Sequence, residues 1–150
     1  MIETFTLNER FALGGEYTWR LKDGEIRFRG SRQFASLVNQ RIPAPEQQVD
    51  AFRDALDLLD VWSWRNDYGP EDVGYAVLDG SAWTFEAAYA GRQCKCGGAN
   101  GYPSFADASK TTTDPGRFAC LVAAMYACFS IDAYIHIAAH QRQREVENRG

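Results

Sequence analysis

The chain has 150 residues, enough for one domain with its own core and too few for two well-packed ones. Apolar residues make up 45% and charged residues 24%, which is ordinary for a globular protein and too hydrophobic for a disordered one. The net charge of −4 argues against a generic nucleic-acid binder, because such a protein needs a surplus of lysine and arginine. We expect a single globular domain over 1–150 with a frayed tail at 141–150.

The N-terminus and the cysteines favour a cytoplasmic protein. Residues 1–7 alternate apolar and polar side chains, whereas a secretory leader needs basic residues followed by an apolar run. Four cysteines are too few for a disulfide scaffold at this length, so reduced thiols are expected. The apolar stretch 118–139 is about as long as a membrane span, but Asp132 lies inside it. We interpret this stretch as a buried core helix.

Strands are predicted in the N-terminal part, the first over 5–13. Asp23 and Gly24 supply the two positive-φ residues of a tight hairpin turn. Closing the hairpin there places Trp19 opposite Phe28 on an apolar face and the charged side chains on the other face. Three arginines on that charged face are interpreted as ordinary soluble surface: Arg20, Arg27 and Arg29.

A helix is predicted over 45–62, after an ambiguous segment at 31–43. Apolar residues recur there at helical spacing, and Pro45 suits a first helical turn. The outward side of this helix is acidic. A solvated surface is the plain interpretation, and a recognition surface that steers a basic partner is the functional one. The members of this acidic face are Glu46, Asp50, Asp54, Asp57 and Asp60.

A three-stranded meander is expected next, with strands at 73–78, 83–89 and 92–97. A two-residue turn at 90–91 places Phe85 opposite Cys96. The segment 97–116 is rich in Gly, Ser, Thr and Asn and is predicted to be a binding loop, a lid or a disordered stretch, with a short helical turn at 104–108.

The last helix is predicted to begin near Thr113 or Asp114 as N-cap, with Pro115 at its first position. Together these elements predict an α+β fold. An antiparallel sheet of about five or six strands, made of the N-terminal hairpin and the C-terminal meander, packs against two main helices. The apolar stripe expected on the last helix has these members: Phe118, Leu121, Val122, Met125 and Phe129.

Two cysteines and two histidines form the sharpest chemical pattern. His136 and His140 lie one helical turn apart and can share a metal, and thiolates suit zinc. Against zinc, a straight strand holds the sulfurs of Cys94 and Cys96 apart and lacks the turn that directs a cysteine pair at one ion. The alternative is that both cysteines are small core residues. No cofactor is predicted, and zinc stays the alternative.

Other catalytic arrangements are less complete. Asp132 lies one turn before His136, so a cysteine–histidine enzyme is conceivable, but no nucleophile elbow or oxyanion loop accompanies them. The glycine-rich segment 97–101 lacks the lysine and hydroxyl residue that end a P-loop. We therefore do not predict an enzyme.

The leading hypothesis is a small non-catalytic protein-binding domain, such as an immunity protein that neutralises a toxin or a phage-encoded inhibitor of a host system. Binding needs a complementary patch and a few anchors, and no tuned acid or nucleophile. The expected partner is a protein with a basic surface, with no nucleic acid and no membrane involved. A homodimer through the C-terminal helix is a further alternative. The predicted partner-binding residues outside the acidic face are Trp64, Tyr68, Asn100 and Tyr102.

Overall fold

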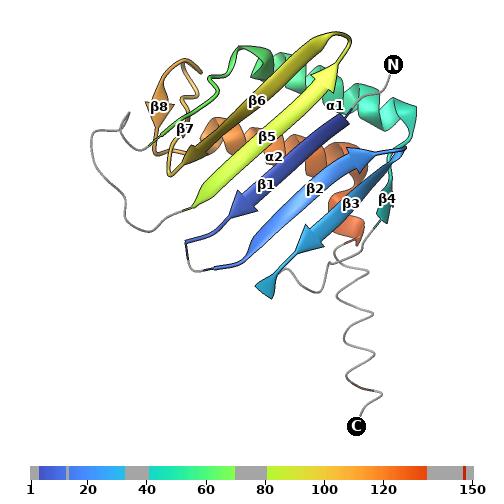
Figure 1. Cartoon of the computed structure of the whole chain (residues 1–150). Helices are drawn as coiled ribbons and strands as arrows, with labels where there is room; N and C mark the ends of the chain where they lie inside the picture. Colours follow the sequence, from blue (N-terminus) through green and yellow to red (C-terminus); the bar gives the residue numbers. More distant parts are fainter. Residues whose placement is uncertain (1–3, 13, 33–40, 70–80, 135–146, 148–150) are drawn as a thin grey trace.

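The computed structural model describes residues 4–12, 14–32, 41–69, 81–134 and 147 (Figure 1). Six strands form one antiparallel sheet in the order β4-β3-β2-β1-β5-β6, which confirms the predicted α+β class. Two main helices lie behind one face of this sheet (Figure 1). The strands are β1 (Thr4–Arg10), β2 (Glu16–Lys22), β3 (Glu25–Gly30), β4 (Arg41–Pro43), β5 (Ala82–Tyr89) and β6 (Arg92–Ala99). The remaining elements are α1 (Glu46–Leu59), the 3-10 turn η2 (Val61–Ser63), β7 (Tyr102–Pro103), β8 (Thr111–Thr112) and α2 (Gly116–Phe129).

The core lies between the sheet and the two helices. The ring of Phe5 on the central strand β1 is 4.9 Å from Phe52 of α1 and 6.0 Å from Phe129 of α2. At the other end, the ring of Trp83 lies 4.6 Å from that of Phe118. Large aromatic side chains from both layers therefore fill the interior, and each buried ring removes about 150–250 Å² from water.

The two tight turns have the registers that the sequence predicts. Asp23 and Gly24 adopt φ angles of 53° and 76°, and Trp19 pairs with Phe28. The turn at 90–91 likewise pairs Phe85 with Cys96. In both hairpins the turn chemistry and the alternation of apolar residues specify the same pairing, which is why local sequence suffices.

The pairing predicted for one edge of β5, the middle strand of the expected meander, is wrong. β5 pairs with β1 along Ala82–Ala88 and with β6 along its whole length, so both of its edges are occupied. The expected strand at 73–78 lies outside the described residues. The N-terminal hairpin and the β5–β6 hairpin instead join into one sheet through β1, because this arrangement aligns the apolar side chains of both hairpins on the helix side.

The segment after β6 is ordered and has no helical turn at 104–108. β7 and β8 pair as a small second sheet, and the backbone N–H of Ser104 donates to the carbonyl of Lys110 at 2.9 Å. The indole N–H of Trp83 donates to the carbonyl of Gly101 at 2.8 Å, which holds this segment against the main sheet. These bonds satisfy backbone groups that a helical turn would otherwise have paired.

Both helices end in a left-handed residue. Asp60 closes α1 with a φ of 52°, so the helix ends earlier than the predicted Trp62. The carboxylate of Asp114 accepts the N–H of Gly116 at 2.9 Å, at the predicted start of α2. Ser130, with a φ of 54°, interrupts the predicted helix 118–139; residues 131–134 are helical again, and 135–139 lie outside the described residues. Within the described ranges, none of the helices has both the length and the apolar character needed to cross a membrane.

We expect Gly98→Ala to lower the free energy of unfolding by about 1–3 kcal/mol, because a methyl group there overpacks a closed site. Its Cβ would lie 2.3 Å from the carbonyl oxygen of Gly101 and 2.8 Å from that of Tyr68. The control is Gly91→Asn, since that turn position has open space and asparagine tolerates its φ of 81°. Urea denaturation measures both variants, and equal stability losses would contradict the close packing.

Candidate functional site

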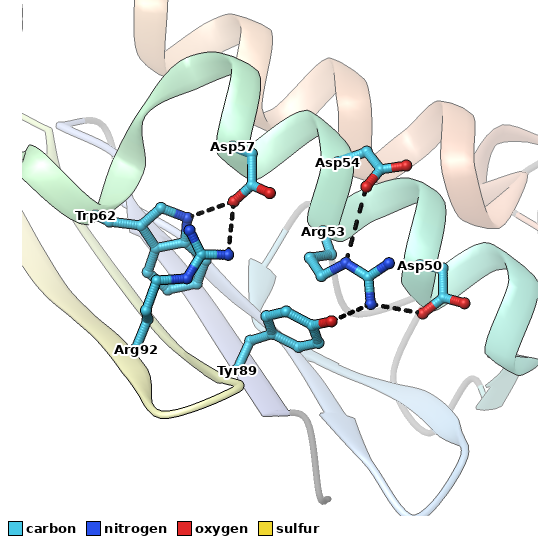
Figure 2. A network of polar contacts seen from close by, with 7 residues as sticks. All are labelled: Asp50, Arg53, Asp54, Asp57, Trp62, Tyr89 and Arg92. Atoms are coloured by element: carbon cyan, nitrogen blue, oxygen red, sulfur yellow. Dashed lines mark hydrogen bonds and ion pairs between the residues drawn. The ribbon is translucent and has the colours of Figure 1, made fainter.

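A network of polar side chains joins the outer side of α1 to the turn between β5 and β6 (Figure 2). Its first centre is Arg53 of α1. The guanidinium Nη1 donates to Asp50 Oδ1 at 2.9 Å and to the hydroxyl of Tyr89, and its Nε lies 3.8 Å from Asp54 Oδ1. This guanidinium also lies 4.5 Å from the centre of the Tyr89 ring. Arg53 is thus fixed by contacts on both its own helix and the sheet.

The second centre of the network is Asp57. Its Oδ1 accepts the indole N–H of Trp62 at 2.7 Å and lies 2.9 Å from Nη2 of Arg92 (Figure 2). The guanidinium of Arg92 stacks over the Trp62 ring, 4.6 Å from its centre. Three elements, α1, η2 and β6, therefore hold one carboxylate in place. Cation–π stacking and an ion pair each contribute about 0.2–1 kcal/mol at such exposed positions, where solvent screens the charges.

The hydrogen bond from Trp62 lowers the pKa of Asp57 below its ordinary value of 3.8, and the positive charge of Arg92 lowers it further. Both contacts favour the charged form of the carboxyl group. Asp57 therefore stays ionised throughout the physiological range. Its stabilising contacts are present above the unfolded pKa and are lost as the pH falls through the lower folded pKa.

The acidic face lies on the surface as predicted and keeps a negative charge. Three of its five carboxylates, those of Asp50, Asp54 and Asp57, contact the guanidinium groups of Arg53 and Arg92. The side chain of Asp54 is 73% exposed. The carboxylate of Asp60 is hydrogen-bonded within its own turn, because the hydroxyl of Ser63 donates to it at 2.7 Å.

An exposed leucine lies beside this face. Leu58 follows Asp57 directly and is 88% exposed. The other large hydrophobic residue that is exposed among the described residues is Phe105, at 61%, in the segment between β7 and β8. In protein interfaces, an apolar side chain of this kind is buried against the partner and charged groups form the rim.

The structure corrects the expectation that Trp64 and Tyr68 are surface aromatics. Trp64 is 6% exposed and its indole N–H donates to the carbonyl of Leu59 at 3.0 Å. Tyr68 is fully buried and its hydroxyl donates to the carbonyl of Ala108 at 2.5 Å. Both polar tips find backbone acceptors, that of Trp64 at the end of α1 and that of Tyr68 in the segment after β6.

Asn100 and Tyr102 also have structural contacts. The side-chain oxygen of Asn100 accepts the N–H of Ser81 at 3.1 Å, and its backbone adopts a φ of 55°. Tyr102 is half-buried, and its ring lies parallel to that of Trp83 at 6.2 Å. Their predicted contact with a partner stays a prediction.

The sulfur atoms of Cys94 and Cys96 are 3.5 Å apart, which corrects the expectation that a straight strand separates them. Both side chains are buried among core residues. The hydrogen bond with Cys94 and burial raise the pKa of the Cys96 thiol, so it stays protonated. His136 and His140 lie outside the described residues. Within the described part of the chain, no three His, Cys, Asp or Glu side chains lie close enough together to hold a metal ion.

Sequence reasoning missed the basic members of the network. Arg53 is three residues after Asp50, a spacing that places the two on the same side of a helix. The roles of Tyr89 and Arg92 have no such local signal, because they depend on how the β5–β6 turn packs beside α1.

Comparison with known protein families, curated proteins and solved structures finds no match for this chain. The function is therefore inferred from the surfaces of the described residues alone.

We expect Trp62→Phe to raise the pKa of Asp57 toward its ordinary value, because the variant removes the hydrogen bond that lowers it most. Carboxyl-group NMR titration measures this pKa. The control is Trp64→Phe, whose indole donates to a backbone carbonyl instead of a carboxylate. An unchanged pKa of Asp57 in Trp62→Phe would show that the hydrogen bond from Trp62 does not hold this carboxylate in its charged form.

Proposed function

We propose that the protein is a small non-catalytic domain that binds another protein through the outer side of α1. The observation that supports this most is the exposed Leu58 next to an immobilised carboxylate, Asp57. A leucine that is 88% exposed adds nothing to the core, whereas burial against a partner removes its apolar surface from water. Full burial of such a side chain stabilises a complex by about 1.5–3 kcal/mol.

The fixed geometry of the network supports the same proposal. Binding normally has to overcome the loss of side-chain freedom, about 0.5–1.5 kcal/mol for each flexible side chain that becomes ordered. The Arg53 and Asp57 groups are already held by several contacts in the free chain. A partner therefore meets an ordered surface, which lowers this entropic penalty.

The charge of the surface indicates the chemistry of the partner. The acidic face has more carboxylates than guanidinium groups, so a basic surface complements it. Complementary charge mainly speeds association, by steering the two proteins together. A domain of this kind acts by covering a functional surface of its partner. We therefore propose that the protein is an inhibitor, either an immunity-type protein against a toxin or a phage-encoded inhibitor of a host system.

We expect Leu58→Ala to weaken binding to the partner about tenfold, the equivalent of 1.4 kcal/mol, because it removes the apolar anchor. The wild-type chain first captures the partner from the native host, and surface plasmon resonance then measures affinity for the purified partner. Phe105→Ala is the matched control, since it removes an exposed ring elsewhere. Thermal unfolding checks that both variants fold. Equal affinity of Leu58→Ala and wild type would exclude this surface.

We expect Asp54→Lys to slow association several-fold at low ionic strength while the dissociation rate changes little, because rim charges act mainly on encounter. Asp54 is largely exposed, so folding is spared. The control is Glu16→Lys, the same change of charge at an exposed residue of β2. Stopped-flow association kinetics at two salt concentrations measure the effect. Equal slowing by both variants would mean that only the net charge matters.

A further inference from the structure

The two main helices lie on one face of the sheet, and none of the described helices covers the opposite face at β2, β3 and β4 (Figure 1). Side chains alternate between the two faces of a strand, so the residues between the buried positions of β2 and β3 point outward. On these three strands the outward positions are strongly basic. The resulting basic face consists of Arg20, Lys22, Arg27, Arg29 and Arg41.

The strand register aligns three of these arginines in a row. Arg20 is directly opposite Arg27, and Arg27 is directly opposite Arg41. Neighbouring strands lie about 4.8 Å apart, so the row spans about 10 Å. Like charges directly opposite one another across strands destabilise a sheet. The row therefore costs folding free energy, and a bound anion would remove that cost.

The charge compensation inside the chain is weak. One oxygen of Glu25, Oε2, lies 3.9 Å from Nε of Arg27 and 3.8 Å from Nε of Arg41. Both distances are too long for a hydrogen bond. Among the described residues, no ion pair involves Arg20 or Lys22.

The basic face is also hollowed. Its five cationic side chains, with Thr18 and Phe28, line a shallow depression of about 420 Å³. This volume lies in the range of small-molecule sites. The cations therefore converge on a limited space instead of spreading over a flat surface.

The geometry points to a site for a compact polyphosphate, a linear triphosphate group with several negative charges close together. Four of the five cations are arginines, and the planar guanidinium group donates two parallel hydrogen bonds to phosphate oxygens. Three arginines in one row can contact successive phosphates. The group can come from inorganic tripolyphosphate or from a nucleoside triphosphate.

A nucleic-acid strand fits the basic face less well. Such a strand needs cations along several nucleotides and aromatic rings on which its bases stack. The aromatic side chains of the described strands β1, β2, β3 and β5 are buried or half-buried toward the helices. On β1 the outward side chains of Thr6 and Asn8 are neutral, and on β5 and β6 Glu86 and Lys95 form an ion pair with each other.

Isothermal titration calorimetry of the full chain tests the site with sodium tripolyphosphate, ATP and orthophosphate as probes. We expect tripolyphosphate to bind at least about tenfold more tightly than orthophosphate, because each additional phosphate makes further charge-assisted contacts with the row of arginines. The affinity should fall steeply between about 50 and about 200 mM salt. Tighter binding of ATP than of tripolyphosphate would identify a nucleoside as part of the ligand, and the reverse would identify the inorganic anion.

Arg20→Gln should weaken tripolyphosphate binding about tenfold, whereas Lys95→Gln, on the same sheet face but outside the depression, should leave it unchanged. Without ligand, Arg20→Gln should raise the melting temperature by about 1–2 °C, because it relieves repulsion in the row. Leu58→Ala should bind tripolyphosphate like the wild type, which separates this site from the proposed protein-binding surface.

Three results would overturn the inference. The first is equal affinity for tripolyphosphate and orthophosphate, and the second is equal affinity of Arg20→Gln and Lys95→Gln for tripolyphosphate. The third is tighter binding of a single-stranded oligonucleotide or of a glutamate-rich peptide than of any polyphosphate at this face, since either would mean that the occupant is a macromolecule.

Discussion

The pairing of β1 with β5 is the constraint on which the rest of the structure depends. It joins two hairpins that lie far apart in the sequence and makes β1 the strand against which both helices pack, through Phe5. The alignment also brings the β5–β6 turn beside α1, where Tyr89 contacts Arg53 and Arg92 contacts Asp57. Because such long-range pairing has to close a large loop, the contact between apolar side chains and the helices must offset its entropic cost.

The same pairing explains why the charged surfaces separate. With both helices on one side of the sheet, the acidic face of α1 and the basic face of β2, β3 and β4 belong to different layers (Figure 1). The net charge of −4 averages over these two regions. The net charge therefore gives no sign of the basic face. The strand register is what brings its arginines together.

Local sequence predicted the hairpins but not the contacts between distant segments. Asp23 and Gly24 can adopt positive φ, so the hairpin and the pairing of Trp19 with Phe28 followed directly. Arg20 opposite Arg27 was implicit in that register, whereas the position of Arg41 was not, because 31–43 has no clear periodicity. The burial of Tyr68 depends on the carbonyl of Ala108, which is 40 residues away. The acidic face was predictable from helical spacing, and its basic partners from the sheet were not.

The two proposed surfaces are expected to act independently. The diameter of a helix with its side chains, about 10–12 Å, lies between the outer side of α1 and the sheet, and it exceeds the Debye length of about 8 Å at physiological ionic strength. Exposed charges on the acidic face and the basic face are therefore mostly screened from each other. A protein that binds the acidic face does not have to displace a small anion from the basic face, because the sheet separates the two faces (Figure 1). Coupling between the sites would require a change in the β1–β5 pairing or in the packing of Phe5 against both helices. Phe5 lies in the buried core, and a close-packed core resists such a change.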